Sequence, residues 1–347
     1  PVLGRLLPAA ASPGTSNGIN ALAMPARTPA DTGPCCVFLP RSMTVGKDGT
    51  EIFFTRSDGI LGKASAAAVN ANSAATAFTL QPVPGRMDLG GIALGPQDTL
   101  WFSENGAYNV TDPNVPLGWP GNRMSYATTG LGITQLVNIA FQSGSLASIR
   151  YDAGPSGVAI SPDGEAWFTE ADSGNPGYRV ARVSPTGNPA TTYTEYQLPC
   201  VPMASPCSGS YTDTGPVDLA FSPDKDLWYT NQVRKSLGRL DANRTTFTEY
   251  SLASIDPALA NGKPADMASA QDGTVWFAVR GGFSAPGANA LVRIAPGQNG
   301  AAPTSTVYPL GSGNDPASIA VSPTGDVWFS SPSVSGGTPG RLGRLAG

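Results

Sequence analysis

Histidine is absent from this sequence, which removes the side chain most often used as a general base and as a nitrogen ligand for metals. Charged residues are also scarce, at 13% of the chain, and the formal net charge is only -4. Lys and Arg do not cluster in any segment, so the sequence offers no basic patch that could bind nucleic acid or an anionic membrane. No apolar run reaches the roughly 18 residues of a membrane-spanning helix. We therefore expect no nucleic-acid partner and no membrane span.

Cysteine is nearly as scarce, with four residues. Cys35 and Cys36 are adjacent, while Cys200 and Cys207 bracket a Pro-containing loop. Without histidine and with this spacing a zinc site is disfavoured, so we expect structural disulfides. A bridge between Cys200 and Cys207 would close the loop, but the sequence leaves the connectivity of all four residues open. Because disulfides persist in oxidising compartments, we expect a secreted protein, extracellular or periplasmic.

Glycine and proline are abundant instead, with 42 and 33 residues. This composition favours short strands joined by many turns over helices, and therefore an all-β protein.

One short stretch recurs along the chain in six copies, and five of the six tryptophans occupy a single register within it. Phe53 takes the tryptophan position in the first copy. The copies are GKDGTEIFFTR (46–56), GPQDTLWFSE (95–104), SPDGEAWFTE (161–170), SPDKDLWYTN (222–231), AQDGTVWFAV (270–279) and SPTGDVWFSS (322–331).

Each copy predicts a turn followed by a strand, because Pro, Asp and Gly suit the turn and the aromatic pair suits a buried strand. A short apolar strand precedes each copy, a third strand follows it, and a fourth strand closes most units. Four strands at a period of roughly 50 residues indicate a β-propeller. We predict six four-stranded antiparallel blades within a single domain, 19–347. The predicted blade cores lie near 41–80, 89–140, 156–199, 216–253, 264–311 and 316–347.

The aromatic pairs, such as Trp167 and Phe168, are expected to pack blade against blade. A basic residue recurs once in each third strand, and we expect it to bond from blade to blade. Its members are Lys63, Arg182, Arg239, Arg293 and Arg344.

The succession SPDGEAWFTE (161–170), RVARV (179–183) and TEYQLP (194–199) resembles the virginiamycin B lyase, or streptogramin lyase, family of propellers, and more distantly the gluconolactonase-like ones. The resemblance extends over roughly 41–347 and implies the propeller fold. In that family the reaction depends on a catalytic histidine with a bound magnesium ion, and seven units are usual. This sequence has no histidine, so the resemblance implies the fold without that general base.

Acidic and amide side chains stand where second strands end or first strands begin. If they converge at the axial mouth, they form an all-oxygen site suited to Ca²⁺ or Mg²⁺, as in the gluconolactonase-like propellers. No cofactor is otherwise required. The candidate ligands are Glu104, Glu170, Asp218, Asp266 and Asn231. The alternative is that this rim is solvated or structurally satisfied.

Two features suggest contact with a partner. Trp119 is the one tryptophan outside the repeat register and lies in a long loop, 105–122, where it either meets a partner or packs onto the propeller body. Leu3, Gly4, Arg5 and Leu6 repeat the L-G-R-L of the third strands at 237–240 and 342–345.

The last repeat supplies only three strands, and an open edge needs a cover. We expect residues 19–24 to provide the fourth strand. Residues 1–18 then form an N-terminal extension that either folds back onto its own blade or donates a strand to a neighbouring subunit, which would build a polymer.

These observations favour a non-catalytic, secreted propeller that acts as an extracellular structural or interaction module. Its expected partners are copies of itself, which would assemble into oligomers or filaments through the N-terminal segment, or another extracellular protein or glycan. The alternative is a metal-dependent lyase or lactonase with an axial carboxylate site.

Overall fold

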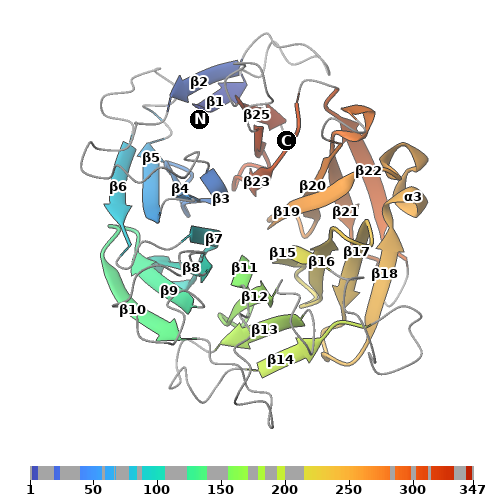
Figure 1. Cartoon of the computed structure of the whole chain (residues 1–347), viewed down its shortest axis with the longest axis horizontal. Coiled ribbons are helices and arrows are strands. Elements are labelled where there is room, and N and C mark those ends of the chain that lie inside the picture. The colour runs from blue at the N-terminus through green and yellow to red at the C-terminus, as the bar shows by residue number, and fades with distance from the viewer. Residues whose placement is uncertain are drawn as a thin grey trace, which may run out of the picture.

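The computed structural model is an all-β propeller, in which antiparallel sheets stand like blades around a central axis (Figure 1). It describes residues 2–6, 19–23, 40–56, 59–65, 67, 78–83, 88–105, 123–138, 155–170, 179–183, 194–199, 215–281, 286–297, 302–311, 314–331 and 341–345. Five four-stranded sheets and one three-stranded sheet surround the axis. A two-stranded ladder lies at the N-terminus.

Each blade follows the chain outward from the axis, so its strands come in sequence order. The first two blades contain β3 (Pro40–Val45), β4 (Glu51–Arg56), β5 (Ile60–Ser65) and β6 (Phe78–Pro82), then β7 (Asp88–Leu94), β8 (Thr99–Asn105), β9 (Arg123–Thr128) and β10 (Ile133–Asn138). The third and fourth contain β11 (Pro155–Ile160), β12 (Ala166–Glu170), β13 (Arg179–Val183) and β14 (Thr194–Gln197), then β15 (Pro216–Phe221), β16 (Leu227–Asn231), β17 (Ser236–Leu240) and β18 (Phe247–Ser251).

The fifth blade contains β19 (Lys263–Ser269), β20 (Val275–Arg280), β21 (Ala290–Ala295) and β22 (Thr304–Pro309). The sixth repeat forms β23 (Ser318–Val321), β24 (Val327–Ser331) and β25 (Arg341–Leu345). Short helical turns are η2 (Pro96–Asp98), α3 (Leu252–Ile255), η3 (Pro257–Leu259) and η4 (Pro286–Ala288). Within the described part of the chain, no helix has the length and apolar character needed to cross a membrane.

The innermost strands close a ring around the axis. Each lies beside its successor, in the order β3, β7, β11, β15, β19 and β23, and β23 returns to β3. The sixth repeat therefore completes the ring even though its sheet has three strands.

The repeated aromatic pair explains the packing between blades. Trp167 is fully buried against Tyr229 of the next blade, and Trp228 is buried against Phe277 of the one after. Each residue of the pair faces a different neighbouring blade, so two consecutive apolar residues suit one strand. Burying a large side chain of this kind contributes about 2 to 3 kcal/mol. The predicted packing role is confirmed.

The turn between the first two strands needs one residue in the left-handed region. Gly164 supplies it in the third blade with φ 84°, as the SPDG pattern predicts. In the fourth blade the same position is Lys225, with φ 68°, where a side chain adopts the conformation at some cost in backbone energy.

The prediction of six four-stranded blades is wrong for the sixth repeat, whose sheet, as far as the chain is described, has the three strands β23, β24 and β25. Residues 19–24 do not add its fourth strand. Instead β1 (Val2–Leu6) lies beside β25 and pairs antiparallel with β2 (Ile19–Ala23), so the N-terminal strands lie against the sixth sheet of their own chain (Figure 1). Both β1 and β2 contact β25, and β1 repeats the L-G-R-L of that neighbouring third strand.

Candidate functional site

The predicted metal ligands come from two sets of positions that meet at one end of the ring. In the third blade Glu170, the last residue of β12, pairs with Pro155, the first residue of β11. In the fourth blade Asn231 pairs with Pro216 in the same way. A bulge then shifts the inner strand, and Asp218 follows two residues beyond Pro216.

Asp218 and Asp266 are brought together by this arrangement. Both are buried, on the neighbouring inner strands β15 and β19. The Asp218 side chain donates a hydrogen bond to Asp266, and its Oδ2 accepts one from the Met267 amide at 2.6 Å. Asp266 Oδ2 in turn accepts from Ser318 Oγ at 2.6 Å and from the Ile319 amide at 2.8 Å. The two carboxyls thus link three consecutive inner strands.

Burial dominates the electrostatics of this pair. It raises the pKa of Asp218 well above its usual range, and the neighbouring Asp266 raises it further. Burial also raises the pKa of Asp266, to about 6, against the hydrogen bonds that it accepts from Asp218, Ser318 and Ile319. The hydrogen bond between the two carboxyls therefore uses a proton that Asp218 carries.

The other three candidates have separate partners. Glu104, fully buried in β8, accepts a hydrogen bond from Ser125 Oγ at 2.5 Å. Glu170 lies opposite Arg179 in the ladder between β12 and β13. Asn231 Oδ1 accepts from the Gly215 amide at 3.0 Å and the Arg234 amide at 3.2 Å, so it closes the turn after β16.

The five predicted ligands therefore do not converge on one point. Across the residues that the structure describes, no group of three or more acidic or cysteine side chains could hold a metal ion. Asp218 and Asp266 are close together, but backbone amides of the next blade already engage their oxygens. The described residues thus form no cluster of three carboxylates, and a Ca²⁺ or Mg²⁺ site stays a prediction.

A second set of hydrogen bonds links the blades, and the sequence did not predict it. The Thr or Ser after the aromatic pair donates its hydroxyl to a carbonyl on the inner strand of the next blade. Thr230 Oγ1 donates to Ala265 O at 2.6 Å, and Ser103 Oγ donates to Ser156 O at 2.5 Å. Thr55 and Thr169 make the equivalent bonds. The fifth repeat has Ala278 at this position, and there the Asp266 carboxylate makes the crossing.

Glu249 was also missed, because its outer-strand position reads as exposed. Its side chain is only 14% exposed, and Arg234 Nη1 donates to its Oε1 at 3.1 Å. The Tyr229 hydroxyl and Asn231 Nδ2 also donate to this oxygen, at 3.2 and 3.4 Å. Burial, and then the Glu249 charge, raise the pKa of Tyr229 well above its usual range. The sequence signal for this role is the T-E-Y that the fourth strands of the third and fourth blades share. In the third blade its glutamate, Glu195, pairs with Arg179.

In the first, third, fourth and fifth blades the basic residue of the third strand bonds within its own blade, which corrects the prediction of bonds between blades there; the side chain of Arg344 lies outside the described part. Arg182 pairs with Glu165 at 2.9 Å, Arg239 with Asp226, and Lys63 with Glu51 at 2.7 Å. The reason is the strand register. Arg182 lies opposite Trp167, and Arg239 lies opposite Trp228, so each base is close to the acidic residue that precedes that tryptophan in the same blade.

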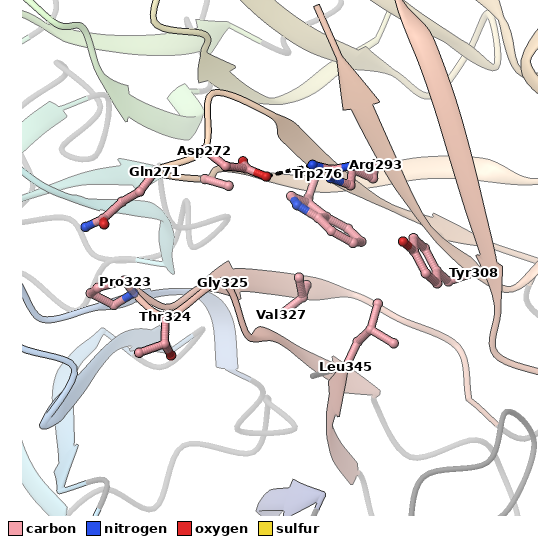
Figure 2. A pocket seen from close by; sticks show the side chains of 11 residues that line it. Gln271, Asp272, Trp276, Arg293, Tyr308, Pro323, Thr324, Gly325, Val327 and Leu345 are labelled. Atoms are coloured by element: carbon pink, nitrogen blue, oxygen red, sulfur yellow. Dashed lines mark hydrogen bonds and ion pairs between the residues drawn. The ribbon is translucent and has the colours of Figure 1, made fainter. Parts of the chain in front are cut away.

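A hollow of about 550 Å³ opens between the fifth blade and the sixth sheet (Figure 2). Trp276 and Tyr308 line one side, together with the ion pair between Arg293 and Asp272 at 2.7 Å. Pro323, Thr324, Gly325, Val327 and Leu345 line the other side.

Several predictions fall outside the described residues. Cys35, Cys36, Cys200, Cys207 and Trp119 lie there, so the disulfides and the tryptophan contact stay predictions. Leu3, Gly4, Arg5 and Leu6 are described as a strand only.

No family model and no curated protein matches the chain. Solved structures do. A virginiamycin B lyase from Staphylococcus aureus, solved as a catalytically inactive histidine-to-alanine variant with quinupristin, gives a TM-score of 0.54 at 19% identity, over 88% of this chain and 84% of that one. A streptogramin B lyase gives 0.52 at 21% identity, over 84% and 89%.

The fold resembles the virginiamycin B lyase propeller. It is not confined to that enzyme. The aldose sugar dehydrogenase of Streptomyces coelicolor, in its PQQ-bound form, gives a TM-score of 0.55 at 16% identity, over 90% of this chain and 95% of that one. At such identities the likeness shows the fold alone.

Proposed function

We propose that this chain is a non-catalytic interaction module, a propeller that binds a partner and catalyses no reaction at its axis. The observation that carries this proposal is the bonding of Asp218 and Asp266. Their oxygens accept from Met267, Ser318 and Ile319 of the following inner strands. Carboxyls held in this way link blades, and their use as ligands or bases would break those links.

The lack of histidine supports the same proposal. The virginiamycin B lyase variant that resembles this chain lost a histidine and is described as catalytically inactive. This chain has no histidine at any position. Asp218 is a poor substitute as a general base, because burial raises its pKa and so favours the protonated form.

We place the module outside the cell, as the expected disulfides suggest, with an extracellular protein or glycan as its partner. Assembly by strand donation is the less favoured mode, because β1 lies beside β25 of its own chain and would have to leave that edge to reach a neighbour.

The direct test is turnover. The full chain is incubated with quinupristin and with a simple aryl lactone, and products are followed by mass spectrometry beside virginiamycin B lyase as a positive control. We expect both compounds to remain intact. Turnover that Asp218→Asn or Asp266→Asn abolishes, while the fold is retained, would overturn the proposal in favour of a lyase or lactonase.

A further inference from the structure

One groove between blades holds an arginine of the chain itself. Between the third and fourth blades, the guanidinium of Arg244 lies over Trp167, with Cζ 4.8 Å from the ring centroid. The same group lies 5.4 Å from the ring centroid of Phe221. Arg244 belongs to the turn between β17 and β18, so the fourth blade reaches back over the third.

Three features build this site. Trp167 is stacked on Tyr196, with centroids 5.3 Å apart and an interplanar angle of 20°. Arg244 Nη1 donates to Lys225 O at 2.7 Å, and Lys225 is the left-handed residue of its turn. Burial lowers the pKa of Arg244, which indicates that the guanidinium is partly removed from water.

The groove between the fifth blade and the sixth sheet repeats these features. Trp276 is the register equivalent of Trp167, and it stacks on Tyr308 at 5.3 Å and 28°. Gly325 takes the place of Lys225 in the turn, also left-handed, with φ 86°. All three residues line the hollow (Figure 2).

The charges beside the tryptophan also match. Arg182 pairs with Glu165 next to Trp167, and its Cζ lies 5.8 Å from the ring centroid. Arg293 pairs with Asp272 next to Trp276. Because Arg244 stacks on Trp167 despite the nearby Arg182, the corresponding pair does not exclude a guanidinium from the second groove.

Among the described residues, no side chain occupies the second groove as Arg244 occupies the first. Val321 takes the place of Phe221 and is smaller. The counterpart of Arg244 would lie on a turn that leads from the third strand to the fourth, and the described ladder of the sixth sheet contains the three strands β23, β24 and β25. The hollow of about 550 Å³ results.

We propose that this hollow binds the arginine side chain of a partner protein. The guanidinium lies on the face of Trp276, as in a cation–π contact, and donates a hydrogen bond to the Gly325 carbonyl. The hollow lies between the fifth blade and the sixth sheet, and none of the axial carboxyls lines it. The inference therefore goes beyond the proposed function and would hold even if the axis proved catalytic.

The test is calorimetric titration of the full chain with the peptide Ala-Ala-Arg-Ala-Ala and with its citrulline analogue, which keeps the shape and removes the charge. We expect one site per chain, with the citrulline peptide and the variant Trp276→Leu each weakening binding by about tenfold. Free guanidinium should compete. Equal binding of the two peptides, or binding that Trp276→Leu leaves unchanged, would overturn the proposal.

A second variant keeps the proposal falsifiable if Trp276→Leu does not fold. Arg244→Ala empties the first groove, so the arginine peptide should then occupy two sites per chain. A stoichiometry that stays at one, with the fold intact, shows that these aromatic grooves do not select arginine and overturns the inference. Circular dichroism and thermal unfolding check the fold of each variant.

Discussion

The Asp218 carboxyl donates a hydrogen bond to Asp266 across the boundary between the fourth and fifth blades. Each carboxyl also accepts from the next inner strand, so the bonds run without interruption from β15 through β19 to β23. These links join the last blades of the ring, where the sheet of the sixth repeat has three strands.

The shared proton predicts how stability depends on pH. Burial raises the pKa of Asp266 from 3.8 to about 6 and also raises that of Asp218 well above its usual range, so the native state retains protons that the unfolded chain releases. The free energy of unfolding should therefore fall as pH rises through about 6, for Asp266 by about 3 kcal/mol at most.

Asp218→Asn isolates this effect, because the amide donates to Asp266 without a proton to lose. The variant should match the wild type near pH 4 and be more stable by about 1 to 3 kcal/mol near pH 7, measured by urea unfolding. Unfolding free energies that run parallel across this range would show that the pair shares no proton.

Removing one of the hydroxyl-to-carbonyl hydrogen bonds between blades should lower the free energy of unfolding. Thr230→Val removes the bond to Ala265 O and leaves that buried carbonyl without its hydroxyl donor, which should destabilise the protein by about 1 to 3 kcal/mol. Thr306→Val makes the same chemical change on an exposed outer strand and should stay within about 0.5 kcal/mol. Equal unfolding midpoints for the two variants would exclude a structural role for the hydroxyl.

Gly157 predicts a steric limit at the inner ring. A Cβ there would lie 2.1 Å from Asp218 Oδ1 and 2.4 Å from its Cα, so a backbone must move. Gly157→Ala should cost at least about 2 kcal/mol, whereas Gly287→Ala, with nothing within 4 Å, is the matched control. Thermal unfolding at one pH compares them, and an unaffected Gly157→Ala would contradict the close approach of β11 and β15.

Two ion pairs should contribute differently to the free energy of unfolding, because one is more buried than the other. Glu249→Ala removes the carboxylate from Arg234, which is only 8% exposed, and should cost about 3 kcal/mol or more. Glu51→Ala breaks the more exposed pair with Lys63, whose side chains are 36% and 25% exposed, and should cost about 1 kcal/mol or less. Denaturant unfolding tests both, and similar losses would argue against a buried Glu249 network.

Much of the fold could be predicted because it repeats. The repeated tryptophan, as at Trp167 and Trp228, marks the second strand of each blade, because that strand is packed between two neighbouring blades. The sixth sheet could not be predicted from its own repeat, because which distant segment lies beside β25 is decided by tertiary contact. β10 was missed because ITQLVN lacks the T-E-Y that the fourth strands of the third and fourth blades share.

The candidate site was less predictable than the fold. Sequence placed Asp218 and Asp266 at equivalent positions, but whether they bind a metal or the next blade depends on where the Met267 and Ile319 amides point. A bulge in each of these two inner strands sets this direction, and the amino-acid sequence gives no sign of it. The arginine groove is recognisable only by comparing one groove with another.

The most direct measurement is the calcium dependence of unfolding for the wild type and Asp218→Asn at neutral pH. If the axial carboxyls serve as links between blades, millimolar Ca²⁺ leaves the unfolding free energy of both proteins unchanged. If they form a metal site, Ca²⁺ stabilises the wild type by about 2.7 kcal/mol at 100 times the dissociation constant, and Asp218→Asn abolishes that gain.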